Sequence, residues 1–146
     1  MKLEVFCLCD AATVSGGKLN ILGIFDVIYA GQVPVLHAQC AIAIRLRFQR
    51  IEEGEHRLKL NVVDEDGHPV MRTLDGNLAV KFGPEDETST ANFIVNLQQL
   101  KLEKFGTYSI DMALDSRHEA SLPLMVKPIQ QPQPESEGFG GSPVQG

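Results

Sequence analysis

The chain has 146 residues, of which 43% are hydrophobic and 22% are charged, a composition typical of globular proteins. This length predicts one domain whose core needs neither a disulfide framework nor a structural metal. The net charge of −6 disfavours binding to nucleic acid or to anionic membranes, because both require a concentrated positive field.

The first two predicted strands, 2–11 and 18–29, are joined by the turn signal Ser15-Gly16-Gly17 and so form a hairpin. This hairpin is apolar on both faces. One face carries Leu3, Val5, Cys7, Leu19, Ile21, Phe25 and Val27, and the other carries Phe6, Leu8, Leu22, Ile24 and Ile28. Because one face of such a sheet should contact water, the second stripe needs a cover, which could be a loop, the chain's own tail or another subunit.

The same region indicates the compartment. Glu4 and Asp10 bracket an apolar run that is too short for a signal peptide, and the chain has no run of about 18 apolar residues that could span a membrane. The three cysteines, Cys7, Cys9 and Cys40, are an odd number without metal-site spacing, which favours reduced thiols packed as small apolar side chains. We therefore expect a cytoplasmic protein.

The next two predicted strands, 37–48 and 56–64, alternate apolar and polar residues and so have one buried face each. If they form a hairpin, basic side chains lie opposite one another. The predicted basic patch consists of Arg45, Arg47, Arg50, Arg57 and Lys59. Two interpretations remain: neighbouring glutamates shield these charges and the charges protect a sheet edge, or the patch binds an anion or an acidic partner.

Four further strands are predicted at 70–82, 90–99, 105–114 and 118–127. Turn signals fall at Asp66-Gly67, Asp75-Gly76, Gly83-Pro84 and Asp115-Ser116. Pro123 lies inside the last strand, and because proline has no N–H for a ladder, that strand is expected at a sheet edge. The whole pattern predicts an all-β fold, an antiparallel two-sheet sandwich of about eight strands, either immunoglobulin-like or jelly-roll-like.

Acidic residues gather in the predicted loops between these strands, as in calcium-binding sandwiches. They are Asp64, Asp66, Glu85, Asp86 and Asp115. The Asp-x-Asp-Gly fragment lacks the remaining spacing of a calcium loop, and an Asp-Gly turn explains it without a ligand. The four histidines show neither metal-site nor triad spacing. We therefore identify no catalytic, cofactor-binding or metal-binding motif.

The composition changes after the last strand. The segment 128–146 is rich in proline, glycine and glutamine and cannot bury enough apolar surface to offset its ordering entropy. We therefore expect a β-sandwich domain at 1–127 and a low-complexity tail at 128–146.

Three segments carry a resemblance. They are Cys9-Asp10-Ala11-Ala12-Thr13, the run Gly17-Lys18-Leu19-Asn20-Ile21-Leu22-Gly23, and Val63-Asp64-Glu65-Asp66-Gly67. Over roughly residues 1–127 the chain resembles an uncharacterised family of small bacterial proteins, a domain of unknown function. The resemblance implies a β-sandwich without assigned activity, so it carries over no functional residue. Gly106-Thr107-Tyr108 also looks like the start of the penultimate strand of immunoglobulin-like sandwiches.

Three functions follow, in order of preference. The first is a non-catalytic binding or self-assembly module, without a cofactor, that uses the apolar outer face of the N-terminal hairpin to contact copies of itself or another protein. The second is a small-ligand or metal-binding domain that acts through the acidic loops. The third is an enzyme.

Overall fold

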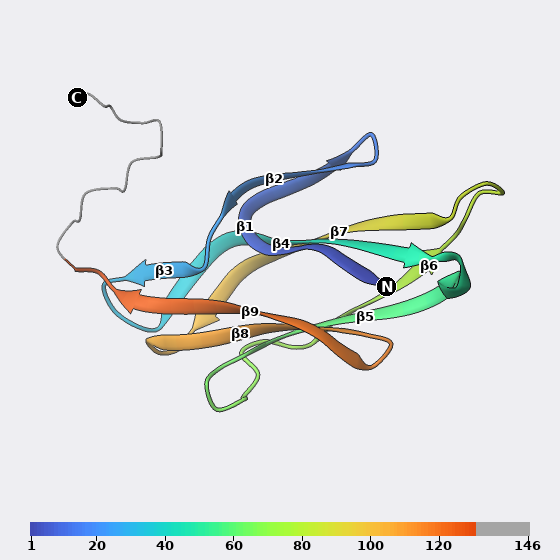
Figure 1. Cartoon of the computed structure of the whole chain (residues 1–146). Coiled ribbons are helices and arrows are strands. Elements are labelled where there is room, and N and C mark those ends of the chain that lie inside the picture. Colours follow the sequence, from blue (N-terminus) through green and yellow to red (C-terminus); the bar gives the residue numbers. More distant parts are fainter. Residues whose placement is uncertain (131–146) are drawn as a thin grey trace, which may run out of the picture.

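The computed structural model describes residues 1–130, which form nine β-strands in two sheets (Figure 1). Sheet A contains, in spatial order, β2 (Lys18–Ile24), β1 (Lys2–Ser15), β4 (Val35–Gln49) and β7 (Thr88–Leu102). Sheet B contains, in spatial order, β3 (Val27–Ala30), β9 (Arg117–Pro128), β8 (Gly106–Leu114), β5 (Gly54–Val63) and β6 (Leu74–Val80). Neighbouring strands are antiparallel except β3 and β9, which are parallel.

One hydrophobic core lies between the two sheets. Sheet A contributes the even-numbered side chains of β4 from Cys40 to Phe48, and sheet B contributes alternate side chains of β5, β8 and β9. The fully buried members include Ile42, Ile44, Leu46, Phe48, Leu60, Val62, Ile110, Met112 and Leu124. The alternation that predicted these strands therefore reflects their inward faces. The all-β prediction with two sheets is confirmed, with nine strands rather than eight.

The additional strand arises where the predicted strand 18–29 divides into β2 and β3. The Phe25 N–H donates to the carbonyl of Leu8 in sheet A at 3.0 Å, whereas the next carbonyl, that of Asp26, accepts from Met125 N–H in sheet B at 2.8 Å. Consecutive residues thus bond to different sheets. β3 continues in sheet B, with Val27 opposite Met125.

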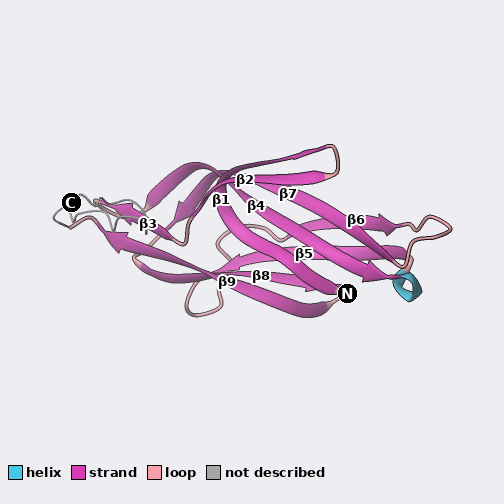
Figure 2. Ribbon diagram, turned by 45° about the horizontal axis from the view of Figure 1, so that its top comes forward, coloured by secondary structure: helices cyan, strands magenta, loops and turns pink. Residues whose placement is uncertain are grey.

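An apolar cluster also covers the outer face of sheet A. Its buried members are Cys7, Cys9, Ala41 and Ala43, and side chains from β1, β2 and β7 pack against them, including Leu19, Ile21 and Ile94. Figure 2 shows the hairpin of β1 and β2 on the side of sheet A away from sheet B. The hairpin itself therefore covers this face.

The hairpin reaches this position because β1 bends. Gly23, opposite the bend, has a φ of +70°, and a Cβ on it would lie 2.5 Å from Oδ2 of Asp10. Only glycine therefore fits without displacing that carboxylate. At the tip, Asn92 Nδ2 of β7 donates to the carbonyl of Gly17 at 3.3 Å, which holds the hairpin over the sheet.

The predicted hairpin of strands 37–48 and 56–64 is wrong. β4 and β5 lie in different sheets, and the 3-10 turn η1 (Arg50–Glu52) carries the chain between them. β4 instead pairs with β1 and β7. The turn expected at Asp75-Gly76 is also wrong, because both residues lie within β6 and pair with β5. Period-two alternation finds such strands but does not encode their partners.

Tyr108 fixes the corner at which β8 begins. Its buried hydroxyl donates to the carbonyl of Lys104 at 2.7 Å and accepts from Lys104 N–H at 3.1 Å. β9 ends at Pro128. From residue 131 onward the expected tail lies outside the described residues. Within residues 1–130 the structure has no helix that is long and apolar enough to cross a membrane.

Candidate functional site

The N-terminal half of β1 has an open edge. β4 pairs with one side of β1 from Lys2 to Cys9, whereas β2 pairs with the other side only from Cys9 onward. Because the carbonyl of Leu8 accepts from Phe25 on this second side, strand geometry directs the backbone groups of Phe6, two residues earlier, to the same side. Within residues 1–130 no strand pairs with that side of β1 before Cys9.

In the part of the chain that the structure describes, β9 has a second open edge in its N-terminal half. β8 pairs along one side of β9, and β3 covers the other side only from Met125 onward. Since Met125 N–H points to the β3 side, the nitrogen of Pro123 points there too. A proline at this position leaves no N–H unpaired. The prediction that Pro123 marks a sheet edge is therefore confirmed for this half of β9, and it is wrong for the half that β3 covers.

A cleft of about 420 Å³ lies between the two open edges, and we call it the seam cleft. β1 contributes one wall of the cleft and β9 the other. The residues that connect β2 to β3 close one end. The lining residues are Phe6, Cys7, Leu8, Ile24, Phe25, Asp26, Leu122 and Pro123. Apart from Asp26 the lining side chains are apolar or a thiol. The seam cleft thus combines an apolar wall with unpaired strand backbone.

The five residues expected to form an apolar interface separate into two groups. Leu8 and Ile28 are buried, and Phe6 packs against the same core between the sheets. Leu22 and Ile24 are instead 69% and 67% exposed. Ile24 lines the seam cleft, so the exposed pair adjoins it. The other cleft residues, notably Phe25 and Leu122, were not expected at a site, and Pro123 was the sequence signal that pointed to this edge.

The three cysteines are buried free thiols. Burial raises the pKa of Cys9 and of Cys40 from 9.0 to about 11. The Sγ of Cys9 donates to the carbonyl of Ala41 at 3.5 Å. At neutral pH both thiols are protonated, so neither is in the thiolate form that attacks substrates or binds metals.

The basic residues expected in one patch occupy three places. Arg45 and Arg47 lie on the outer face of sheet A, where Glu4 of β1 accepts from Nε of each at 2.9 and 2.6 Å. Arg47 first and Arg45 second hold the pKa of Glu4 below its ordinary value. One carboxylate therefore offsets half of this positive charge.

The other three basic residues lie elsewhere. Arg57 of β5 donates to both carboxylate oxygens of Asp75 on β6, and Lys59 follows on the same strand. Arg50 of η1 donates to the carbonyl of Gly83 at 2.7 Å and so holds the loop between β6 and β7. Together with the bonds of Arg45 and Arg47 to Glu4, these contacts give four of the five basic residues a structural partner within the fold.

The acidic residues lie at both ends of β5. Asp64 and Asp66 follow β5, whereas Asp115 bonds near its start and Glu85 and Asp86 follow β6 at that same end. The arrangement therefore does not bring the five carboxylates into one cluster.

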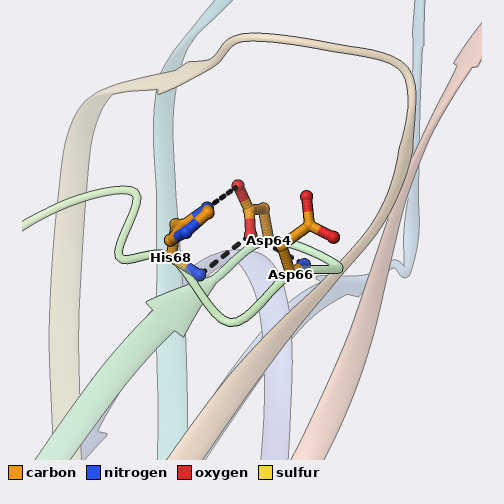
Figure 3. Close-up of side chains that lie close together, drawn as sticks. All are labelled: Asp64, Asp66 and His68. Atoms are coloured by element: carbon orange, nitrogen blue, oxygen red, sulfur yellow. Dashed lines mark hydrogen bonds and ion pairs between the residues drawn. The ribbon is translucent and has the colours of Figure 1, made fainter.

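The carboxylates of Asp64 and Asp66 do lie close to the His68 ring (Figure 3), with one ligand atom of each residue within 4.8 Å of the others. Asp64 Oδ1 already accepts from the backbone N–H groups of Asp66 and His68, each at 2.9 Å. Lys104 Nζ lies 3.7 Å from Asp64 and 3.5 Å from Asp66. The backbone N–H groups of this loop and the ammonium group of Lys104 thus account for the position of the two carboxylates.

His56 connects the two ends of a polar network at the junction of the sheets. Its Nδ1 donates to Asp115 Oδ2 and its Nε2 donates to the carbonyl of Glu52, both at 2.6 Å. Because both partners only accept, the ring carries two protons. Burial alone would lower the pKa of His56, but the hydrogen bonds to Glu52 and Asp115 outweigh it, so the pKa is raised above 6.5. The same bond holds the pKa of Asp115 below 3.8.

This network predicts a pH-dependent stability. Since the folded pKa of His56 is raised, its contribution is complete below about pH 6.5 and is lost as the pH rises through the folded value. We expect a His56 pKa above 6.5 by NMR titration and a loss of stability as the pH rises above 6.5 and through the folded value. Asp115→Asn should return the pKa towards 6.5 and flatten that dependence. A folded His56 pKa below 6.5 would contradict the expectation.

Comparisons with known proteins give a family but no activity. A model of a family of unknown function (DUF6941) matches residues 4–127. No curated protein matches the chain. Among solved structures, the chain is similar to a β-glucosidase from Listeria innocua in complex with isofagomine, with 13% sequence identity and a TM-score of 0.45. That match covers 86% of this chain and 16% of the other, and at this level of similarity it carries no argument about activity.

Proposed function

Because the chain belongs to a family of unknown function (DUF6941), which assigns no activity, we propose from its surface that it is a non-catalytic protein-binding module. Its ligand is an extended segment of a partner protein that adds as a strand to the open edge of β1. An apolar side chain of this segment occupies the seam cleft.

The observation that carries the proposal is an apolar cleft beside the edge of β1 that no strand within residues 1–130 pairs with before Cys9. An extended peptide gains main-chain hydrogen bonds at such an edge and specificity from a side-chain pocket. The opposite wall does not compete, because Pro123 removes an N–H from the edge of β9. Leu22 and Ile24, both exposed beside the cleft, extend the apolar contact surface.

We also propose an immunoglobulin-like sandwich for the fold and the cytoplasm for the location. Strands β1, β4 and β7 oppose β5, β8 and β9, as the ABE and CFG strands do in immunoglobulin domains, and Tyr108 forms the corresponding corner. The three free thiols favour a reducing compartment.

Selection of displayed random octapeptides on the full-length protein tests the binding function. We expect selected peptides to shift the backbone amide resonances of Phe6 and Leu8. Ile24→Glu should weaken their binding at least about tenfold, because a carboxylate beside the apolar cleft loses hydration when the peptide docks. Ile51→Glu is the matched control, since Ile51 is 93% exposed and lies on η1.

Two results would contradict the proposal. One is a set of selected peptides that bind equally well to the Ile24→Glu variant and leave Phe6 unshifted. The other comes from light scattering: a native dimer that Leu22→Glu converts into a monomer would assign this surface to a second copy of the chain instead.

A further inference from the structure

A second cleft shares Phe25 with the seam cleft. It has a volume of about 350 Å³, and we call it the aromatic cleft. The lining residues are Asp10, Phe25, Val27, Ile28, Tyr29 and His37. They come from β1, from β3 with the residues that precede it, and from the start of β4. A volume at the lower end of the range for ligand sites favours a small ligand.

Aromatic rings form the walls of the aromatic cleft. Tyr29 is 62% exposed, because on β3 its neighbours Ile28 and Ala30 point into the core. The rings of Phe25 and His37 pack against each other with centroids 5.6 Å apart. The faces of phenylalanine and tyrosine rings carry the negative part of a quadrupole and attract cations. These walls therefore suit a cation that also has apolar surface.

Asp10 supplies the charge that complements a cation. Its carboxylate lies against Gly23, since a Cβ on that residue would lie 2.5 Å from Oδ2. Within residues 1–130 no lysine, arginine or histidine side chain forms an ion pair with this carboxylate. The net charge of −6 on the chain adds to the attraction for cations.

We infer that the aromatic cleft binds a small organic cation, namely a compound with a quaternary or alkylated ammonium head group. The head group lies on the rings of Phe25 and Tyr29, with Asp10 close to its positive charge. A metal ion does not suit this cleft, because one carboxylate supplies too few of the oxygen ligands that Ca²⁺ or Mg²⁺ requires.

This inference does not rest on the proposed function. β2 already pairs with β1 from Cys9 onward, so a segment added to the open edge of β1 ends before Asp10. A partner segment in the seam cleft and a cation in the aromatic cleft therefore occupy separate places, with Phe25 lining both.

Titration of the full-length protein with choline tests the inference, with backbone amide shifts measured by NMR at constant ionic strength. We expect saturable shifts at Tyr29 and His37. The control ligand is neohexyl alcohol, in which carbon replaces the nitrogen of choline. It should bind at least about fivefold more weakly, because it lacks both the cation–π attraction and the attraction to Asp10.

Variants of the lining residues test the two parts of the site. Asp10→Asn should weaken choline binding about fivefold, since it removes an opposite charge close to the ligand. Tyr29→Leu should weaken it at least about twofold, whereas Tyr29→Phe keeps the ring and should not. Glu119→Gln is the matched control for charge, because Glu119 is exposed near the start of β9. The melting temperature of each variant confirms that the domain stays folded.

The outcomes separate this inference from the proposed function. Absence of saturable choline shifts overturns the inference, as does equal affinity for choline and neohexyl alcohol. Equal effects of Asp10→Asn and Glu119→Gln overturn it too, because the cleft then has no charged partner for a cation. Octapeptides that compete with choline would assign the aromatic cleft to a cationic side chain of the partner segment and overturn a small ligand. Choline binding without any octapeptide binding supports the inference and overturns the proposed function alone.

Discussion

Replacing Phe48 with alanine should lower the free energy of unfolding by about 3–5 kcal/mol, measured by urea denaturation. Phe48 is completely buried at the end of β4, where the chain is about to cross from sheet A to sheet B. Its ring also stacks on that of His56, with centroids 5.0 Å apart. The substitution therefore leaves a cavity and removes one wall of the polar network around His56.

Ile51→Ala provides the control for this prediction. Ile51 lies three residues further along the chain and is 93% exposed, so its truncation should change the unfolding free energy by less than about 0.5 kcal/mol. Equal effects of the two substitutions would show that Phe48 is not packed as described. Phe48→Ala should also move the NMR-measured pKa of His56, because its burial decreases.

Replacing Ala43 with leucine should destabilise the protein by about 1–3 kcal/mol, because the larger side chain overpacks a filled space. Ala43 is completely buried on the outer face of sheet A, beneath the β1–β2 hairpin. A leucine there must push the hairpin away from the sheet. We expect faster amide exchange at Leu19 and Ile21, together with the lower unfolding free energy.

Ala38→Leu is the matched control, because Ala38 lies on the same strand and is exposed. It should leave both the unfolding free energy and the exchange of the hairpin unchanged. If Ala43→Leu is as harmless as Ala38→Leu, the hairpin does not cover that face of sheet A.

The strands could be predicted from the sequence because burial leaves a local trace. In β4 the alternation from Cys40 to Phe48 marks the core face directly. The pairing of strands leaves no such trace. The short turn before Gly54 resembled a hairpin connection, yet η1 carries the chain to the other sheet, so the predicted opposition of Arg47 and Arg57 does not exist.

In the candidate site, too, the sequence indicated the type of residue but not its position in space. The excess of apolar residues in the N-terminal hairpin predicted an apolar outer stripe, and of its residues Leu22 and Ile24 are exposed. Leu8 and Ile28 have the same chemical character but lie in the core, because the chain changes sheets at Phe25 and Asp26. The cleft depends on β1 and β9 meeting across the domain, which only the three-dimensional arrangement determines.

The parallel pairing of β3 with β9 also sets an order of events during synthesis. Val27 cannot pair with Met125 until Met125 has been synthesised. A ribosome that adds about 5–20 residues per second needs roughly 5–20 s to make the intervening chain. For that interval Ile28, which is buried in the finished domain, lacks the neighbouring strand β9. Contacts this distant in sequence also slow folding itself. The newly made chain is therefore most vulnerable to aggregation before its last strand emerges, and this is when chaperones would be needed most.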